Sequence, residues 1–399
     1  LVLSVTMTPL MGAAAVEDLR LSVVYAFAIA PLVAGPVGAI AARLVRESVE
    51  ERGGSQVFEI FRTAALLSGV LATVLAALVA LALGIRPAGV AIGFVWTTAA
   101  AALLWTSFAF LARAFRRADD DPGFALRLLL AALAREWPLA LGIAAAIAAI
   151  WADKVVFWLG PEGMRSAAGF AHYAPYDSVM FVAHLSLVPS LAAMLLFQDG
   201  ALPEAIGRFR TALAERATCE EVRAAADAIG GTVWGHVLSI VFVQATFSAV
   251  LIMLAPLVAG AMDFDLIQFD LLRTGIVAIF LQSIIYLSCG VLMICNRLWF
   301  LFLIQVFFLT VNLTISILLL ELIGVNTWAV FIASISTALV AFLAAHRTLS
   351  EYAYLVFVGE NRALYDRDLQ GLPAEPAGRG IRASLAGARR AWAALARRE

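Results

Sequence analysis

Long apolar segments separated by short polar stretches dominate the pattern of the chain. A helix that crosses the hydrocarbon of a bilayer needs about 20 predominantly apolar residues. By that criterion we expect ten spans, the first of them incomplete, at 1 to 16, 21 to 42, 63 to 85, 88 to 112, 137 to 160, 176 to 197, 232 to 260, 274 to 295, 298 to 322 and 326 to 345. Segment 124 to 134 is too short to cross and carries Arg127, which favours a helix at the membrane surface. The pattern predicts an all-α, polytopic membrane helix bundle.

Composition supports this class and excludes others. The 399 residues are 63% hydrophobic and 14% charged, whereas soluble domains are roughly half apolar and about a quarter charged. The net charge of -1 argues against a nucleic-acid binder. The cysteines, Cys219, Cys289 and Cys295, have no metal-binding spacing. We therefore expect no enzymatic domain, no metal and no cofactor.

The distribution of basic residues predicts the orientation in the membrane. Loops on the cytoplasmic side of a bilayer are enriched in Lys and Arg, and here 23 of the 28 basic residues fall in alternate loops and in the tail after residue 345. Both ends of this chain are therefore expected in the cytoplasm. The opposite loops are short, so nothing large is expected to fold outside.

An acidic pair in the first outer loop raises one enzymatic alternative. Glu17 and Asp18 superficially fit the acidic residues that membrane glycosyltransferases with lipid-linked donors place in an outer loop. Those enzymes carry much larger outer loops or domains than this chain offers, so the pattern disfavours this alternative.

Glycine and proline interrupt several expected spans. Such residues are typical of helices that pack closely or that break to line a cavity, although membrane helices also tolerate them routinely. The candidate helix breaks are Pro31, Gly35, Pro36, Pro189 and Pro256.

Two adjacent charges lie within the fifth span. Asp153 is followed by Lys154, the only lysine of the chain, and ionisable groups inside a membrane are functional candidates because burying them is costly. Neighbouring helical residues point about 100° apart, so the two groups are expected to need separate partners or a shared watery cavity. The structural alternative places Lys154 near the outer interface, where it reaches toward the headgroups between Trp151 and Trp158.

Other polar residues inside the spans allow two interpretations. His184 and His236 either relay protons or make interhelical hydrogen bonds. The same choice between helix packing and cavity lining applies to the amides and hydroxyl at Gln244, Gln282, Gln305, Asn312 and Thr314.

Two polar segments suit docking to a partner or to lipid. In the loop after the sixth span, Ile206, Phe209 and Leu213 fall on one helical face beside arginines. In the tail, Trp392 and Leu395 belong to a similar apolar stripe. Both helices could lie on anionic lipid or bind a protein.

The segment from 153 to 190 resembles the PelG family, inner-membrane transporters of the Pel exopolysaccharide system. The matching residues are Asp153-Lys154, Phe157-Trp158, Pro161-Glu162-Gly163, Tyr176-Asp177, Met180 and Pro189, and the earlier segment 23 to 36 also matches. The chain departs from the family in its ten expected spans and in the run Gln198-Asp199-Gly200, where an acidic-aromatic stretch is expected.

The resemblance implies a flippase-like fold of twelve spans in two lobes around a central cavity. On this chain the lobes would be 1 to 160, with its first span truncated, and 161 to 345, followed by a basic cytoplasmic tail from 346 to 399. It also implies export of a partly cationic amino-sugar polymer, together with a cytoplasmic glycosyltransferase and membrane proteins that sense cyclic di-GMP. The candidate transport path comprises Asp153, Lys154, Trp158, Glu162, Tyr176 and Asp177.

Two other functions remain open from the residues alone. A cation-coupled flippase for drugs or lipid-linked oligosaccharides needs a protonatable carboxylate deep in one lobe, and Asp153 is the deep candidate. A non-transporting scaffold of a synthase complex needs no polar cavity. The leading hypothesis is a polysaccharide transporter of the bacterial inner membrane.

Overall fold

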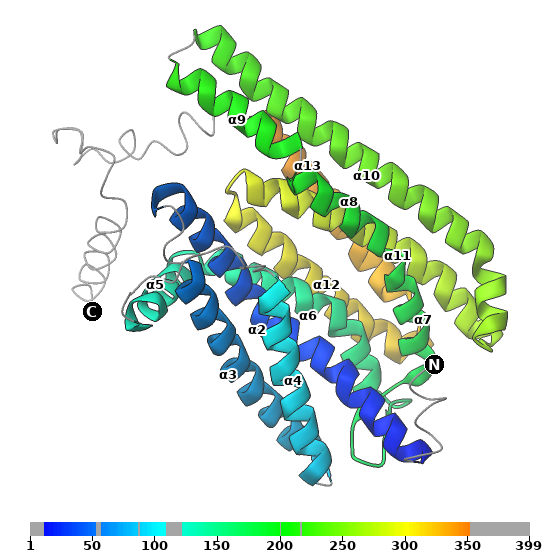
Figure 1. The fold of residues 1–399 in the computed structure, drawn as a ribbon. Helices are drawn as coiled ribbons and strands as arrows, with labels where there is room; N and C mark the ends of the chain where they lie inside the picture. The colour runs from blue at the N-terminus through cyan, green and yellow to red at the C-terminus, as the bar shows by residue number, and fades with distance from the viewer. Residues whose placement is uncertain are drawn as a thin grey trace, which may run out of the picture. The chain divides into compact units, whose positions relative to one another are not determined.

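Helices make up almost all of the described structure (Figure 1). The structure is a computed structural model of the chain and describes residues 12–52, 57–86, 88–108, 122–199, 201–215 and 218–351. Its helices are α2 (Ala13–Arg52), α3 (Val57–Leu83), α4 (Ala88–Phe108), α5 (Pro122–Arg135), α6 (Trp137–Leu159), α7 (Ala174–Leu185), α8 (Val188–Asp199), α9 (Ala201–Ala214), α10 (Cys219–Ala261), α11 (Leu266–Ile294), α12 (Leu298–Ile323) and α13 (Trp328–Ser350). A short antiparallel hairpin pairs β1 (Met164–Arg165) with β2 (Ala171–His172).

The described helices confirm a polytopic all-α membrane bundle. Within the described residues, eight helical segments are long and apolar enough to cross a membrane: Ala13–Arg46, Val57–Leu83, Trp137–Leu159, Ala174–Met194, Glu220–Ala261, Leu266–Ile294, Leu298–Ile323 and Trp328–Ser350. The difference from the ten expected spans has two sources. Segment 1 to 16 lies mostly outside the described residues, and the described apolar part of α4, Val90–Thr106, is shorter than a full span.

Four of the expected helix breaks do not occur. Helix α2 continues through Pro31, Gly35 and Pro36, and α10 continues through Pro256. A proline removes one backbone donor, and neighbouring helices can compensate for this in a membrane bundle. At Pro189 the chain does change element, because α7 ends at Leu185 and α8 begins at Val188. The expected sixth span is therefore two consecutive helices.

Three groups of neighbouring helices build the bundle (Figure 1). Helices α2, α3 and α4 pack against one another, α6 packs along α12, and α11 packs along α13. Gly35 allows a close approach between α2 and α6, since a Cβ atom there would lie 3.0 Å from Ile147 Cδ1. All these helices belong to one compact unit, and the division into two lobes at residue 160 stays a prediction.

The crossing of α6 and α12 depends on a glycine. A Cβ atom at Gly142 would lie 2.6 Å from Leu301 Cδ2 and 3.3 Å from the backbone Cα of Phe302. The leucine methyl could rotate away, but the backbone of α12 could move only by separating the two helices. Gly142 therefore sets the distance between α6, which carries the charged pair, and α12.

We expect Gly142→Ala to lower the free energy of unfolding by about 1–3 kcal/mol, because overpacking displaces neighbouring atoms. Thermal unfolding of the purified protein in detergent measures the change. Gly93→Ala is the matched control, since a Cβ atom at this α4 position meets nothing within 4 Å and alanine favours a helix over glycine. Equal melting temperatures for the two variants would contradict the tight contact.

The loop between α6 and α7 contacts the first turns of α2 at one end of the bundle. The β-hairpin receives contacts from the first turns of α2: Glu17 Oε1 lies 3.1 Å from His172 Nε2, and the Asp18 carboxylate accepts a hydrogen bond from the Ala168 amide. From the next turns, Tyr25 donates its hydroxyl to the Ala171 carbonyl at 2.8 Å. The acidic pair Glu17-Asp18, which the sequence places in an outer loop, therefore lies within helix α2 and holds this hairpin in place.

Candidate functional site

The charged pair of α6 is buried inside the bundle. Asp153 is 1% exposed and Lys154 is 7% exposed, and both lie within two turns of the end of α6 at Leu159. Six residues separate Asp153 from that end, which corresponds to about 9 Å along the helix axis. Burial at this depth is costly for ionised groups unless they are paired.

The Lys154 side chain points back along α6. Its Nζ donates a hydrogen bond to the Ile150 carbonyl at 2.9 Å and lies 5.6 Å from the centre of the Trp151 ring. Ile150 precedes Lys154, so the ammonium reaches away from the α6–α7 loop. This direction is the opposite of that expected for a lysine that extends toward the headgroups near that loop.

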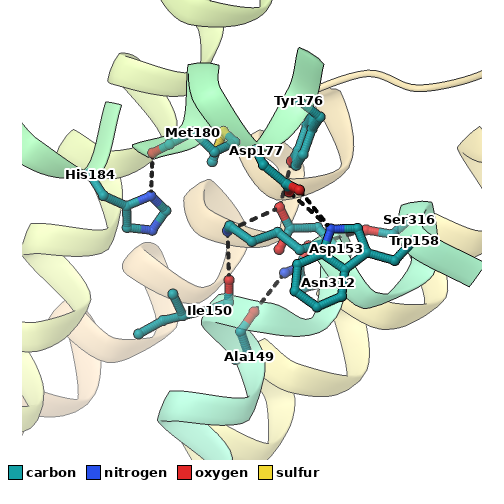
Figure 2. Close-up of polar contacts among 11 residues, drawn as sticks. Ala149, Ile150, Asp153, Trp158, Tyr176, Asp177, Met180, His184, Asn312 and Ser316 are labelled. Atoms are coloured by element: carbon teal, nitrogen blue, oxygen red, sulfur yellow. Dashed lines mark hydrogen bonds and ion pairs between the residues drawn. The ribbon is translucent and has the colours of Figure 1, made fainter. Parts of the chain in front are cut away.

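The two charges also contact each other, in addition to the separate partners that we expect for adjacent helical residues. Lys154 Nζ lies 3.7 Å from Asp153 Oδ2. The side-chain directions of adjacent helical residues do diverge, but the four-carbon stem of the lysine bends across the helix surface. Figure 2 shows the resulting cluster around Asp153.

A tyrosine on α7 completes one side of the Asp153 carboxylate. Tyr176 is fully buried and donates its hydroxyl to Asp153 Oδ2 at 2.5 Å. The other oxygen, Asp153 Oδ1, is buried and has no hydrogen-bond partner in the part of the chain that the structure describes. One side of this carboxylate is therefore free to accept a hydrogen bond from a ligand.

A second carboxylate, that of Asp177, follows Tyr176 directly on α7. Trp158 donates its indole Nε1–H to both oxygens of Asp177, at 3.0 and 2.9 Å, and the backbone amide of Tyr173 donates to the same carboxylate at 3.1 Å. The Trp158 ring stacks on Tyr25 of α2, with the ring centres 5.0 Å apart. Trp158 thus connects α2, α6 and α7.

An asparagine on α12 holds the turn of α6 that carries the charges. Asn312 is fully buried and donates its side-chain amide to the Ala149 carbonyl at 2.8 Å. Ser316, one turn further along α12, lies 3.4 Å from the Asn312 side-chain oxygen. Because Ala149 and Asp153 are one turn apart, this bond orients the segment on which the pair sits (Figure 2).

A histidine on α7 lies beside the same cluster, on the side away from Trp158 (Figure 2). His184 Nδ1 lies 2.7 Å from the Met180 carbonyl, and none of the described residues offers a hydrogen-bond partner to its buried Nε2. The cluster therefore contains two buried polar atoms, Asp153 Oδ1 and His184 Nε2, with unused hydrogen-bonding capacity.

Glu162 lies apart from this cluster, on the exposed α6–α7 loop. Its carboxylate interacts with the Tyr173 hydroxyl, and burial together with this hydrogen bond raises the pKa of the Tyr173 phenol above its ordinary value. Among the candidate path residues, Asp153, Lys154, Trp158, Tyr176 and Asp177 are brought together, and Glu162 is not.

Sequence reasoning missed the role of one residue in this cluster. Tyr25 carries no charge and lies 133 positions before Trp158, so no local pattern links the two rings. Asn312 and His184 were recognised as polar residues inside spans, but only the packing of α6 against α7 and α12 reveals their partners.

The structure buries part of the apolar face of α9 that the sequence predicts for docking. Phe209 is 4% exposed and lies on a helix that packs against α10 and α8, so its side chain is not available to a partner. The described side chains that α9 exposes, among them Glu204, Arg208 and Thr211, are polar. The Ile206 and Leu213 side chains and the tail residues Trp392 and Leu395 lie outside the described residues.

We expect Trp158→Phe to lower the free energy of unfolding by about 1.5–3 kcal/mol. Phenylalanine preserves a ring against Tyr25 but removes the donor to both Asp177 oxygens, and hydrogen bonds to charged groups contribute about this much. Thermal unfolding in detergent measures the loss. Trp96→Phe is the control, because Trp96 is 72% exposed on α4; equal effects of the two substitutions would show that the indole donor contributes nothing specific.

Comparison with known proteins identifies the family to which this site belongs. No curated protein and no solved structure matches the chain. A family model does match: PelG, described as "putative exopolysaccharide exporter (EPS-E)", over residues 113–357. This range covers more than half of the chain and includes α6, α7 and α12, on which the charged cluster is built. The chain is a multi-pass membrane protein that belongs to the PelG family of exopolysaccharide exporters.

Proposed function

We propose that this protein exports a Pel-type exopolysaccharide across the bacterial inner membrane, as a transporter without enzymatic activity of its own. Two features support this function. The family is a transporter-type family, and the helices that match it carry a buried charged cluster. Both ends of the chain are cytoplasmic in this proposal, as the arginine-rich alternate loops predict.

The single observation that carries the proposal is an unused hydrogen-bond acceptor in the Asp153–Lys154 pair. Asp153 Oδ1 is buried without a partner, and such an atom destabilises a protein unless something else uses it. A sugar hydroxyl or amino group can donate to this oxygen. The weak contact at 3.7 Å between Lys154 and Asp153 can be exchanged for contacts with a substrate during alternating access.

The partners in this proposal lie on the cytoplasmic side. A cytoplasmic glycosyltransferase would deliver the growing polymer, and membrane proteins that sense cyclic di-GMP would control the complex. The exposed polar face of α9, which includes Arg208, is the described surface that we assign to such contacts. Charged surfaces steer association and confer specificity, so this docking should weaken as salt rises.

A gene deletion tests the proposed function directly. The deletion strain should lose secreted exopolysaccharide, and a plasmid carrying the intact gene should restore it. Affinity purification of the restored protein from membranes should recover a cytoplasmic glycosyltransferase. Undiminished secretion in the deletion strain would contradict the export function, and restored secretion without the glycosyltransferase would contradict only the proposed partner.

A further inference from the structure

A second group of buried polar atoms lies between α11 and α13, away from the charged cluster. Gln282 and Tyr286 on α11, with Ser334 and Thr337 on α13, each have a buried side-chain oxygen that has no hydrogen-bond partner among the described residues. Gln282, Ser334 and Thr337 are at most 1% exposed. We call these four residues the α11–α13 seam.

The register of the two helices places these residues at matching levels. Helices α11 and α13 pack extensively, and they run parallel because α12 connects them by crossing back. Gly275 and Thr327 mark one level, since a Cβ atom at Gly275 would lie 4.0 Å from Thr327 Cγ2. Gln282 and Ser334 each follow seven residues later, which is about two helical turns, so they lie at the same level of the two helices.

The next turn continues the same alignment. Tyr286 follows Gln282 by four residues and Thr337 follows Ser334 by three, so both remain on the facing stripes. Beyond them on α11, Cys289 accepts a hydrogen bond from Gln305 of α12, whose side-chain oxygen is also buried and unpartnered. The polar stripe therefore runs along α11 toward the α11–α12 turn.

The other end of the seam meets an apolar cluster. Ile276 and Ile279 of α11 and Val330 of α13 pack with the side chains of α7, including Met180, whose Sδ atom would lie 3.3 Å from a Cβ atom at Gly275. Tyr286 of the seam packs against the same cluster, so the seam adjoins the apolar packing between α7, α11 and α13.

Neutral oxygens that have no partner are costly to bury. Serine, threonine and tyrosine hydroxyls both donate and accept hydrogen bonds, and the amide oxygen of Gln282 accepts them. If these groups served only to join the helices, they would be paired, as Gln244 is with Ser190, Ser186 and Ser248 between α8 and α10. Their unpaired state points to a ligand or to a second arrangement of the helices that uses them.

We propose that the α11–α13 seam is a hydrogen-bonding surface for the hydroxyl groups of the exported polysaccharide, and that the polymer reaches it when α11 and α13 separate. This inference rests on the proposed export function. The chemistry fits sugar hydroxyls, because they donate and accept like the seam groups and carry no charge. The seam is thus a neutral surface for the polymer, in addition to the charged cluster of α6 and α7.

Stability and export should respond to seam variants in opposite directions. Gln282→Leu, Ser334→Ala and Thr337→Val replace unpartnered polar groups by apolar groups of similar size, which should preserve or raise the melting temperature. Each lost hydrogen bond to the polymer should weaken binding by about five- to tenfold. The triple variant should therefore insert normally, unfold at an equal or higher temperature, and secrete at least about tenfold less polymer.

Matched variants on α13 and on the neighbouring helix α12 provide the controls. Ser336→Ala removes a hydroxyl from a partly exposed position of α13, and Thr310→Val removes one from an exposed position of α12. Each hydroxyl bonds only to its own helix backbone among the described partners. Both control variants should secrete at the wild-type level.

Three outcomes separate this inference from the function on which it rests. If the intact gene fails to restore secretion in a deletion strain, the export function itself is contradicted. If the intact gene restores secretion and the triple seam variant secretes normally, only the seam inference is overturned. A parallel loss of melting temperature and secretion would also overturn it, because the seam groups would then be structural.

Discussion

Replacing either member of the charged pair on α6 should abolish secretion of the polymer. Asp153→Asn removes the negative charge and leaves Lys154 unpaired, and Lys154→Met leaves the Asp153 carboxylate without its cation. Loss of one partner from a buried pair is expected to cost about 3–5 kcal/mol, because the remaining charge stays buried. Secreted polymer and the amount of protein in the membrane must therefore be measured together for each variant.

A double variant separates a role in transport from a role in folding. Asp153→Asn combined with Lys154→Met removes both charges, so no unpaired charge remains in the bundle, and Tyr176 can still donate to the asparagine oxygen. Thermal stability and membrane levels should return toward the wild-type values, whereas secretion should remain absent. Recovery of secretion in the double variant would show that the pair acts only in folding.

A conservative change elsewhere controls for the loss of a carboxylate. Asp227 lies on an exposed face of α10, and Asp227→Asn should leave both secretion and stability unchanged. Loss of secretion in this control would show that the assay responds to net charge rather than to the buried cluster.

Hydropathy alone is sufficient to predict those membrane-spanning helices that begin and end at the limits of an apolar run. The segment 137 to 160 corresponds to α6 (Trp137–Leu159), and 298 to 322 corresponds to α12 (Leu298–Ile323). Each is bounded by a turn, so the helix and the apolar run end together. For such elements the length of the apolar run is sufficient.

Hydropathy fails where a helix continues into polar sequence. Helix α10 begins at Cys219 rather than 232, because Thr218 and Glu221 form a capping box: the Glu221 amide donates to the Thr218 hydroxyl and the Glu221 carboxylate accepts from the Thr218 amide. The Thr-x-x-Glu spacing is readable in the sequence, and it could have predicted this start. Helix α2 likewise extends to Arg52, but no comparable signal marks its polar end.

The candidate site was predictable in its residue types but not in its contacts. A lone lysine beside an aspartate in an apolar run is visible in the sequence. The bond from Asn312 to the Ala149 carbonyl spans 163 residues, and that from Tyr25 to the Ala171 carbonyl spans 146. Such contacts depend on how α2, α6 and α12 pack, which no local pattern encodes. The same holds for the unpartnered oxygens of the α11–α13 seam.

Exchanging the charges of the Arg43–Glu136 ion pair should show how much this long-range contact contributes to the stability of the bundle. The Arg43 guanidinium on α2 places its Nε atom 3.2 Å from Glu136 Oε2, at the junction of α5 and α6. The same guanidinium donates a hydrogen bond to the Asn296 side-chain oxygen at 2.9 Å. Asn296 adopts a positive φ of 56° in the turn between α11 and α12. Arg43 therefore joins three segments that are distant in sequence.

Arg43→Glu should lower the free energy of unfolding by about 1–3 kcal/mol, because it places two carboxylates together and leaves the largely buried Glu136 without this partner. Glu136→Arg should have a similar effect. The exchange variant Arg43→Glu with Glu136→Arg restores an opposite-charge pair, but its new arginine lies beside Arg135, so it should recover most of the loss rather than all of it. Thermal unfolding of the four proteins in detergent gives the coupling between the two positions. Additive losses in the exchange variant would show that the contact does not join α2 to the α5–α6 junction.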